Sequence, residues 1–237
     1  MAFSFFFRDA QTLDVLVETA MPTLAGQAFI HIWDAGCAHG AEPYSLAMLL
    51  HQRMSEFLFR NVRIHATDVD ASFGRRILSG EYSQEEVARI PGELFRKYFR
   101  PADRPGWFRI DESLQAAVRF AHHDLLSLQP IREGCSLVVC KNVLLHFDES
   151  QRIKVLRMFH RALRSDGLLA LEHTQKIPDA LREMFEPVTV VGWVYRRIEP
   201  SGAAERVEPP HGNPTASHPP HEPRLRPTRL DPVTAAG

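Results

Sequence analysis

The stretch from Trp33 to Leu50, WDAGCAHGAEPYSLAMLL, is the feature that most constrains the fold. The residues just before it, 29–33, are apolar and β-prone, and they predict a buried strand. Gly36, Ala38 and Gly40 then keep side chains out of the way, and an apolar run with helical character follows at once. A strand that passes through such a loop into a helix leaves backbone N–H groups free, so the loop is expected to hold a ligand.

Beyond this loop the chain alternates β-prone and helical runs, which predicts a mostly parallel sheet flanked by helices. The predicted strands are Phe29–Trp33, Val62–Thr67, Val118–His122, Ser136–Cys140 and Leu168–Glu172. The predicted helices are Pro43–Met54, Ala71–Leu78 and Glu149–Arg164. Runs at 188–191 and 193–197, joined at Gly192, predict an antiparallel closing pair. Ligands of such sheets bind outside the carboxyl ends of the strands, so the site is expected there.

The alternation breaks between residues 80 and 120. Two short helices, Gln84–Arg89 and Gly92–Tyr98, lead to short β-prone pieces at Trp107–Ile110 and Gln115–Phe120. These pieces predict a small β subdomain inserted into one larger domain, which spans residues 1–199.

The last 38 residues, 200–237, differ from the rest in composition. They hold nine of the 17 prolines and no Phe, Trp or Tyr. Ordering a chain costs about 1 to 2 kcal/mol of backbone entropy per residue, and this segment has little apolar surface to offset that cost. We expect a disordered, Pro-rich tail.

The charge balance and the cysteines limit the class of protein. Lys and Arg total 28 against 29 Asp and Glu, so the formal net charge of −1 gives no overall attraction to nucleic acid. Cys37, Cys135 and Cys140 have no metal-type spacing, which favours reduced thiols in a cytoplasmic protein. The N-terminal phenylalanines are interrupted by Arg8, so no membrane insertion is expected.

Polar clusters follow the predicted strands. They are Asp34, Asp68, His123 with Asp124, and Lys141 with Asn142. An acidic residue after the second strand can accept the hydroxyls of a ribose, and Asp68 has that place. The alternative is that Asp68 caps the next helix, which is the role favoured for Asp70, and Asp34 is alternatively a turn residue. No metal site is predicted, because the adjacent His122 and His123 would point to opposite faces of a strand.

The spacing of the loop selects among cofactors. The dinucleotide pattern G-x-G-x-x-G is absent, whereas Asp34-x-Gly36-x-Ala38-x-Gly40 resembles the first motif of class I S-adenosylmethionine-dependent methyltransferases, with Ala for the middle glycine. The flanking motifs make the resemblance specific to the CheR family, the chemotaxis receptor methyltransferases. Those motifs are Phe6–Asp9, Ala35–Ala47, Ala66–Asp70, Gly80–Tyr82, Cys140–Phe147 and Leu163–Leu169.

This resemblance implies a class I, Rossmann-like fold that binds S-adenosyl-L-methionine and methylates glutamate side chains on the cytoplasmic helical region of chemoreceptors. It implies catalytic roles for Arg8 and His146. The cofactor contacts it implies are Ser4, Arg8, Gly36, Glu42, Asp68, Asp124, Leu125, Lys141 and Asn142. Nucleic-acid methyltransferases typically end the fourth strand in Pro-Pro-aromatic or Pro-Cys motifs, and Lys141-Asn142-Val143 is neither.

The sequence departs from the family at several places, and one of them is Ala2, which stands where the family has an asparagine that contacts the cofactor. The family usually has a helical domain ahead of the Phe-Phe-Arg motif, whereas here the motif begins almost at Met1, and we expect a truncated gene product, a different docking partner or a different substrate. Lys141 replaces the family's arginine, which keeps the charge and removes a bidentate fork. His146 stands where the family has a tyrosine facing the reaction centre. The alternative function is a catalytically silent member that binds the cofactor or acts as a scaffold.

Overall fold

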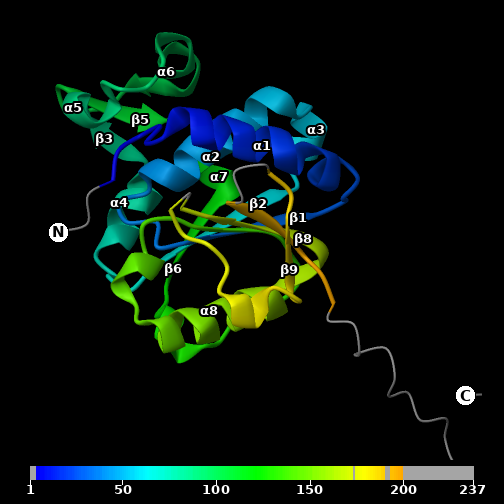
Figure 1. Ribbon diagram of the computed structural model, residues 1–237. Helices are drawn as coiled ribbons and strands as arrows, with labels where there is room; N and C mark the ends of the chain where they lie inside the picture. The colour runs from blue at the N-terminus through cyan, green and yellow to red at the C-terminus, as the bar shows by residue number, and fades with distance from the viewer. Residues whose placement is uncertain (1–3, 173, 190–192, 200–237) are drawn as a thin grey trace, which may run out of the picture. The chain divides into compact units, whose positions relative to one another are not determined.

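The computed structural model describes residues 4–172, 174–189 and 193–199, and it has an α/β architecture (Figure 1). Its large sheet has seven strands in the order β6-β2-β1-β7-β8-β10-β9. The strands are β1 (Ile30–Ala35), β2 (Val62–Asp68), β6 (Val118–His122), β7 (Cys135–Cys140), β8 (Leu163–Leu171), β9 (Phe185–Pro187) and β10 (Val194–Arg197). The five strands from β6 to β8 pair in parallel, and β10 pairs antiparallel with β8 and β9. The predicted fold class is confirmed.

Helices cover both faces of this sheet (Figure 1). On one face lie α1 (Ala10–Ala25), α2 (Ala41–Arg53), α4 (Phe73–Ser79) and α7 (Glu112–Ala117). On the other face lies α8 (Glu149–Ala162), with the 3-10 turns η1 (Leu125–Ser127), η2 (Leu144–His146) and η3 (Asp179–Leu181). A short helix, α3 (Glu56–Phe59), leads into β2. None of the helices in the described ranges is long and apolar enough to cross a membrane.

The central strands are largely buried on both faces, and β7 accordingly has a nearly continuous apolar sequence. In β1, Ile30 and Ile32 join the core under α1 and α2, whereas Trp33 packs edge-on against Phe159 of α8, with ring centroids 5.2 Å apart. In β7, all six residues are buried. Each face of the sheet is thus covered by a hydrophobic core, and ligands can reach the sheet at the ends of its strands.

Helix α1 was not predicted from the sequence. Its apolar residues have helical spacing and are buried: Leu13, Leu16, Val17, Ala20 and Leu24. Its ends carry few of the usual signals, because Asp9 makes no capping hydrogen bond and Pro22 lies inside the helix. The periodicity was the signal that could have revealed it.

The insertion is smaller than predicted. Its sheet has the order β3-β5-β4, formed by β3 (Glu81–Ser83), β4 (Phe99–Pro101) and β5 (Trp107–Ile110), with helices α5 (Gln84–Val87) and α6 (Gly92–Tyr98). The predicted β piece Gln115–Phe120 is wrong as a part of it. Residues up to Ala117 lie in α7, and Val118 already begins strand β6 of the large sheet.

The predicted closing pair is confirmed in kind but begins earlier, at β9, and residues 190–192 lie outside the described residues. The predicted tail, 200–237, also lies outside them.

The insertion packs on the large domain at several places. His51 of α2 lies 2.9 Å from the Tyr98 hydroxyl, and Phe6 packs edge-on against Phe99.

Candidate functional site

A cavity of about 680 Å³ opens at the carboxyl ends of β1, β2, β6 and β7. Its walls come from the N-terminal segment and from the loops that follow these four strands. All ten residues that the sequence singled out for the cofactor or for catalysis line it: Ser4, Arg8, Gly36, Glu42, Asp68, Asp124, Leu125, Lys141, Asn142 and His146. The structure thus brings together residues that are up to 142 positions apart in the chain.

The loop after β1 has an unusual backbone. Gly36, Ala38 and Gly40 all have positive φ angles, of 96°, 47° and 89°. Two backbone groups tie the loop to β2, since the N–H groups of Gly36 and Cys37 donate to the Thr67 carbonyl at 2.8 and 3.0 Å. Glycine is required at position 36 for packing as well, because a Cβ there would lie 2.1 Å from Val143 Cγ2.

Asp68 holds the same loop from β2. Its Oδ2 accepts a hydrogen bond from the Ala38 N–H at 2.9 Å, and its Oδ1 accepts one from the Asp70 N–H at 3.1 Å. A carboxylate has about four acceptor sites, so it retains capacity for two hydroxyl groups of a ligand in the cavity.

The helix-cap interpretation fails for Asp68 and also for Asp70. Helix α4 begins at Phe73, Ser72 is its N-cap residue, and no side chain caps it. Asp70 Oδ1 instead accepts from the Ser72 N–H at 2.9 Å, which closes a turn ahead of the helix.

Lys141 and Glu42 form a buried ion pair at the floor of the cavity. The Nζ atom of Lys141 lies 3.3 Å from Glu42 Oε2 and 3.7 Å from Asp9 Oδ2, and the lysine side chain is 1% exposed. Burial raises the pKa of Glu42, and the charge of Lys141 opposes that shift. Lys141 therefore compensates a carboxylate that faces the ligand space.

Asp34 lies in β1, so its interpretation as a turn residue is wrong. Its side chain is fully buried, and neither carboxylate oxygen has a hydrogen-bond partner in the described structure. Burial, and next the nearby charge of Glu42, raise the pKa of Asp34 well above its ordinary value, against the opposing effect of Lys141. Asp34 stands behind the cavity wall rather than in it.

The loops after β6 and β7 complete the walls. Asp124 Oδ1 accepts from the Leu126 N–H at 2.8 Å and so caps η1 in addition to lining the cavity. Asn142 adopts a left-handed backbone, with φ of 58°, which asparagine tolerates better than most residues. His146 ends η2, the turn that directly follows Asn142 and Val143.

Apart from Leu125, sequence reasoning missed the apolar part of the cavity. Val69, Leu126 and Leu145 line it and are exposed large hydrophobic side chains. Each stands one residue from a predicted contact, and that adjacency was the signal that could have found them. An adenine ring needs an apolar surface, whereas a ribose and an ammonium group need acceptors such as Asp68 and Glu42. The lining has both kinds of group, so it fits S-adenosylmethionine.

The fold and the cavity together define a class I S-adenosylmethionine-binding domain. The comparison with known families makes the assignment specific, because residues 2–191 match the family described as "CheR methyltransferase, SAM binding domain". The chain belongs to the CheR methyltransferase family.

Three curated relatives are named chemotaxis protein methyltransferase. The protein of Borreliella burgdorferi is 30% identical over 73% of this chain and 64% of its own length. That of Listeria innocua is 30% identical over 73% of this chain and 65% of its own length. That of Escherichia coli K12 is 31% identical over 72% and 59%. The chain thus spans somewhat less than two thirds of the length of these relatives.

Proposed function

We propose that this protein transfers the methyl group of S-adenosylmethionine to glutamate side chains in the cytoplasmic helical region of chemoreceptors, forming methyl esters. The observation that carries the proposal is the convergence of the ten predicted residues on one cavity. The family and the names of the relatives support the same activity. A cytoplasmic location follows from such a substrate.

The cavity suits a reaction that needs alignment more than acid–base chemistry. Bound S-adenosylmethionine supplies an electrophilic methyl group on a sulfonium centre. A glutamate side chain is an anion at pH 7, so no residue has to remove a proton from it. Alignment of the reacting groups lowers the activation free energy by about 7 to 11 kcal/mol.

Two residues of the cavity are suited to orient that carboxylate. Arg8 offers a planar fork of N–H donors, and His146 offers a ring N–H. Glu42 and Asp68 are suited to hold the polar groups of the cofactor. The buried Lys141 partly offsets the burial of the Glu42 carboxylate.

Calorimetric titration with S-adenosylmethionine tests the first half of the proposal, and absence of binding by the folded protein would overturn it. Transfer of a radiolabelled methyl group to receptor membranes tests the second half. Binding without transfer to any receptor fragment would instead support a catalytically silent, cofactor-binding scaffold.

His146→Tyr sharpens this test, because tyrosine is the residue that the family has at this place. If alignment dominates, the variant transfers methyl groups at the wild-type rate or faster, since either side chain can donate a hydrogen bond to the substrate. A large loss of rate, with unchanged cofactor affinity, would show that the imidazole has a role that tyrosine does not replace.

A further inference from the structure

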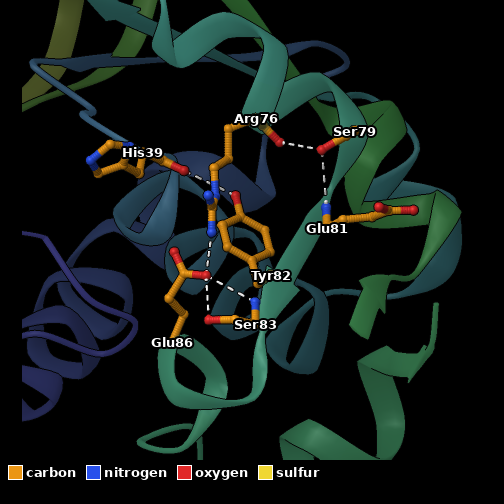
Figure 2. A network of polar contacts seen from close by, with 7 residues as sticks. All are labelled: His39, Arg76, Ser79, Glu81, Tyr82, Ser83 and Glu86. Atoms are coloured by element: carbon orange, nitrogen blue, oxygen red, sulfur yellow. Dashed lines mark hydrogen bonds and ion pairs between the residues drawn. The ribbon is translucent and has the colours of Figure 1, made fainter. Parts of the chain in front are cut away.

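Tyr82 links the insertion to the cofactor cavity. It lies on β3, its side chain is 1% exposed, and its hydroxyl donates a hydrogen bond to the carbonyl of His39 at 3.1 Å (Figure 2). His39 belongs to the loop after β1 that lines the cavity. The bond therefore joins an element of the inserted subdomain directly to the backbone of residues 36–40, which we call the glycine loop.

The far half of that loop is held by this bond, by the edge-on packing of the His39 ring on Phe73 with centroids 4.4 Å apart, and by the hydrogen bond from the Tyr44 N–H to the Gly40 carbonyl at 3.2 Å. The near half is tied to β2 through Gly36, Cys37 and Ala38, as described above. At the far end, the Gly40 N–H bonds within the loop itself, to the Cys37 carbonyl at 3.1 Å. A left-handed alanine such as Ala38 is conformationally costly, so the loop keeps its shape only if its surroundings fix it. Asp68 and Tyr82 fix it from two sides.

Tyr82 also supports a second wall of the cavity. Its ring packs edge-on against Phe6, with centroids 4.8 Å apart. Phe6 is fully buried and stands between Ser4 and Arg8, which both line the cavity. The same tyrosine thus contacts the N-terminal segment with its ring and the glycine loop with its hydroxyl.

Arg76 of α4 holds Tyr82 against the rest of the insertion. The guanidinium of Arg76 lies over the Tyr82 ring at 5.6 Å and over the Trp107 ring at 5.2 Å. It also pairs with Glu86, which accepts hydrogen bonds from the backbone N–H and the hydroxyl of Ser83, each at 2.8 Å (Figure 2). Burial raises the pKa of the Tyr82 hydroxyl well above its ordinary value, so the group stays a donor at every physiological pH.

We propose that Tyr82 is a positioning residue through which the inserted subdomain sets the affinity for the cofactor, by fixing the His39 end of the glycine loop and the Phe6 segment together. The proposal rests on the cofactor site of the proposed function. It assigns to the insertion a role inside the cofactor site, separate from any contact with a protein substrate.

The test compares Tyr82→Phe with Tyr44→Phe. Tyr44 is a matched control, because it is equally buried, its ring centroid is 6.1 Å from that of Tyr82, and its hydroxyl donates to a carbonyl outside the loop, that of Ile77, at 2.7 Å. Each variant loses one buried hydrogen bond, so thermal stability falls in both. The net free energy of one such hydrogen bond corresponds to about a three- to tenfold change in an equilibrium constant.

We expect calorimetry with S-adenosylhomocysteine to show about three- to tenfold weaker binding for Tyr82→Phe and a change within about twofold for Tyr44→Phe. Equal affinity in the two variants would overturn the positioning role. The substitution Tyr82→Phe keeps an aromatic ring against Phe6, so this variant isolates the hydroxyl.

Hydrogen exchange without cofactor gives an independent readout. Amides of residues 36–40 should exchange faster in Tyr82→Phe than in the wild type or in Tyr44→Phe, because the loop loses its second support. Unchanged exchange would contradict the proposal even if the enzyme is active. Failure of the wild type to bind cofactor, with faster exchange in Tyr82→Phe, would instead overturn the proposed function and leave the role of Tyr82 in the loop supported.

Discussion

The two ends of strand β1 carry opposite chemistry within three residues. Near its carboxyl end, Asp34 is fully buried beside Glu42 and Lys141, next to the cofactor cavity. Near its amino end, His31 lies 3.2 Å from His65 of β2, measured between Nδ1 and Nε2, and 2.8 Å from the Arg132 guanidinium. At the carboxyl end of β1, carboxylates lie around a lysine, and at its amino end, imidazoles lie around an arginine.

Both ends shift their titratable groups toward the neutral form, but with different neighbours. Burial raises the pKa of Asp34, whereas burial and nearby cations lower the pKa of His31 and bring that of His65 to about 4. At the histidine end, the neighbouring charges are all cationic: those of nearby arginines and, for His65, the other imidazole. The acidic end contains an internal counter-charge, Lys141, and that end adjoins a cavity. The difference indicates that charge compensation, rather than burial alone, marks the functional end of the strand.

The largest expected effect comes from removing that counter-charge. Lys141→Met should lower the free energy of unfolding by about 3 to 5 kcal/mol, because Glu42 would stay buried without a cation. Urea unfolding monitored by circular dichroism measures it.

Arg132→Met is the matched substitution at the histidine end. There the loss should stay below about 1 kcal/mol, since Arg132 faces imidazoles and makes no ion pair in the described ranges. Equal losses at the two ends would refute the comparison.

Much of the site at the carboxyl end of β1, which adjoins the cavity, could be predicted, because sequence motifs indicate which side chains supply the chemistry. Asp68, Glu42 and Asn142 stood in ordered motifs after predicted strands, and all three line the cavity. The pairing of Lys141 with Glu42 could not be predicted, because it depends on the distance between the first turn of α2 and the loop after β7, and the two residues are 99 positions apart in the chain. The His31–His65–Arg132 group carries no motif; it depends on the register of β1 with β2 and on the loop before β7, which supplies Arg132.

The fold shows the same division. Strands with short β-prone runs, such as β1 and β7, were predicted close to their observed bounds. Two elements were misplaced: α1, whose ends carry few signals, was missed, and Gln115–Phe120 was assigned to the insertion although Asp111 caps α7. Propensity alone does not say which sheet a short β-prone run joins, since packing in the folded chain decides it.

A smaller effect is expected from Asp68→Ala. This change should weaken binding of S-adenosylmethionine at least about tenfold, because the carboxylate both ties Ala38 and offers acceptors to a ribose. Asp70→Ala is the control, since its carboxylate bonds Ser72 outside the cavity. Calorimetric titration of both variants decides it, and similar affinities would remove Asp68 from the cofactor site.

The smallest expected effects are on the pH dependence of stability, and they have opposite signs at the two ends of β1. An unfolded histidine binds a proton near pH 6.5, whereas folded His65 does so only near 4. The unfolded state thus takes up more protons between these values, and stability falls as the pH falls through this window. For Asp34 the folded pKa is raised, so its contribution to stability is present at low pH and is lost as the pH rises through that raised pKa.

His65→Gln should therefore flatten the decline of the melting temperature between pH 6.5 and about 4 and leave the alkaline side unchanged. Asp34→Asn should do the reverse, flattening the decline toward high pH. Thermal unfolding followed by circular dichroism in a series of buffers at constant ionic strength measures both slopes. If either variant flattens both sides, the two clusters do not titrate independently, and the separation of β1 into an acidic functional end and a basic end fails. If each flattens only its own side, the strand carries two electrostatic sites, and only the one compensated by Lys141 is tied to the cofactor cavity.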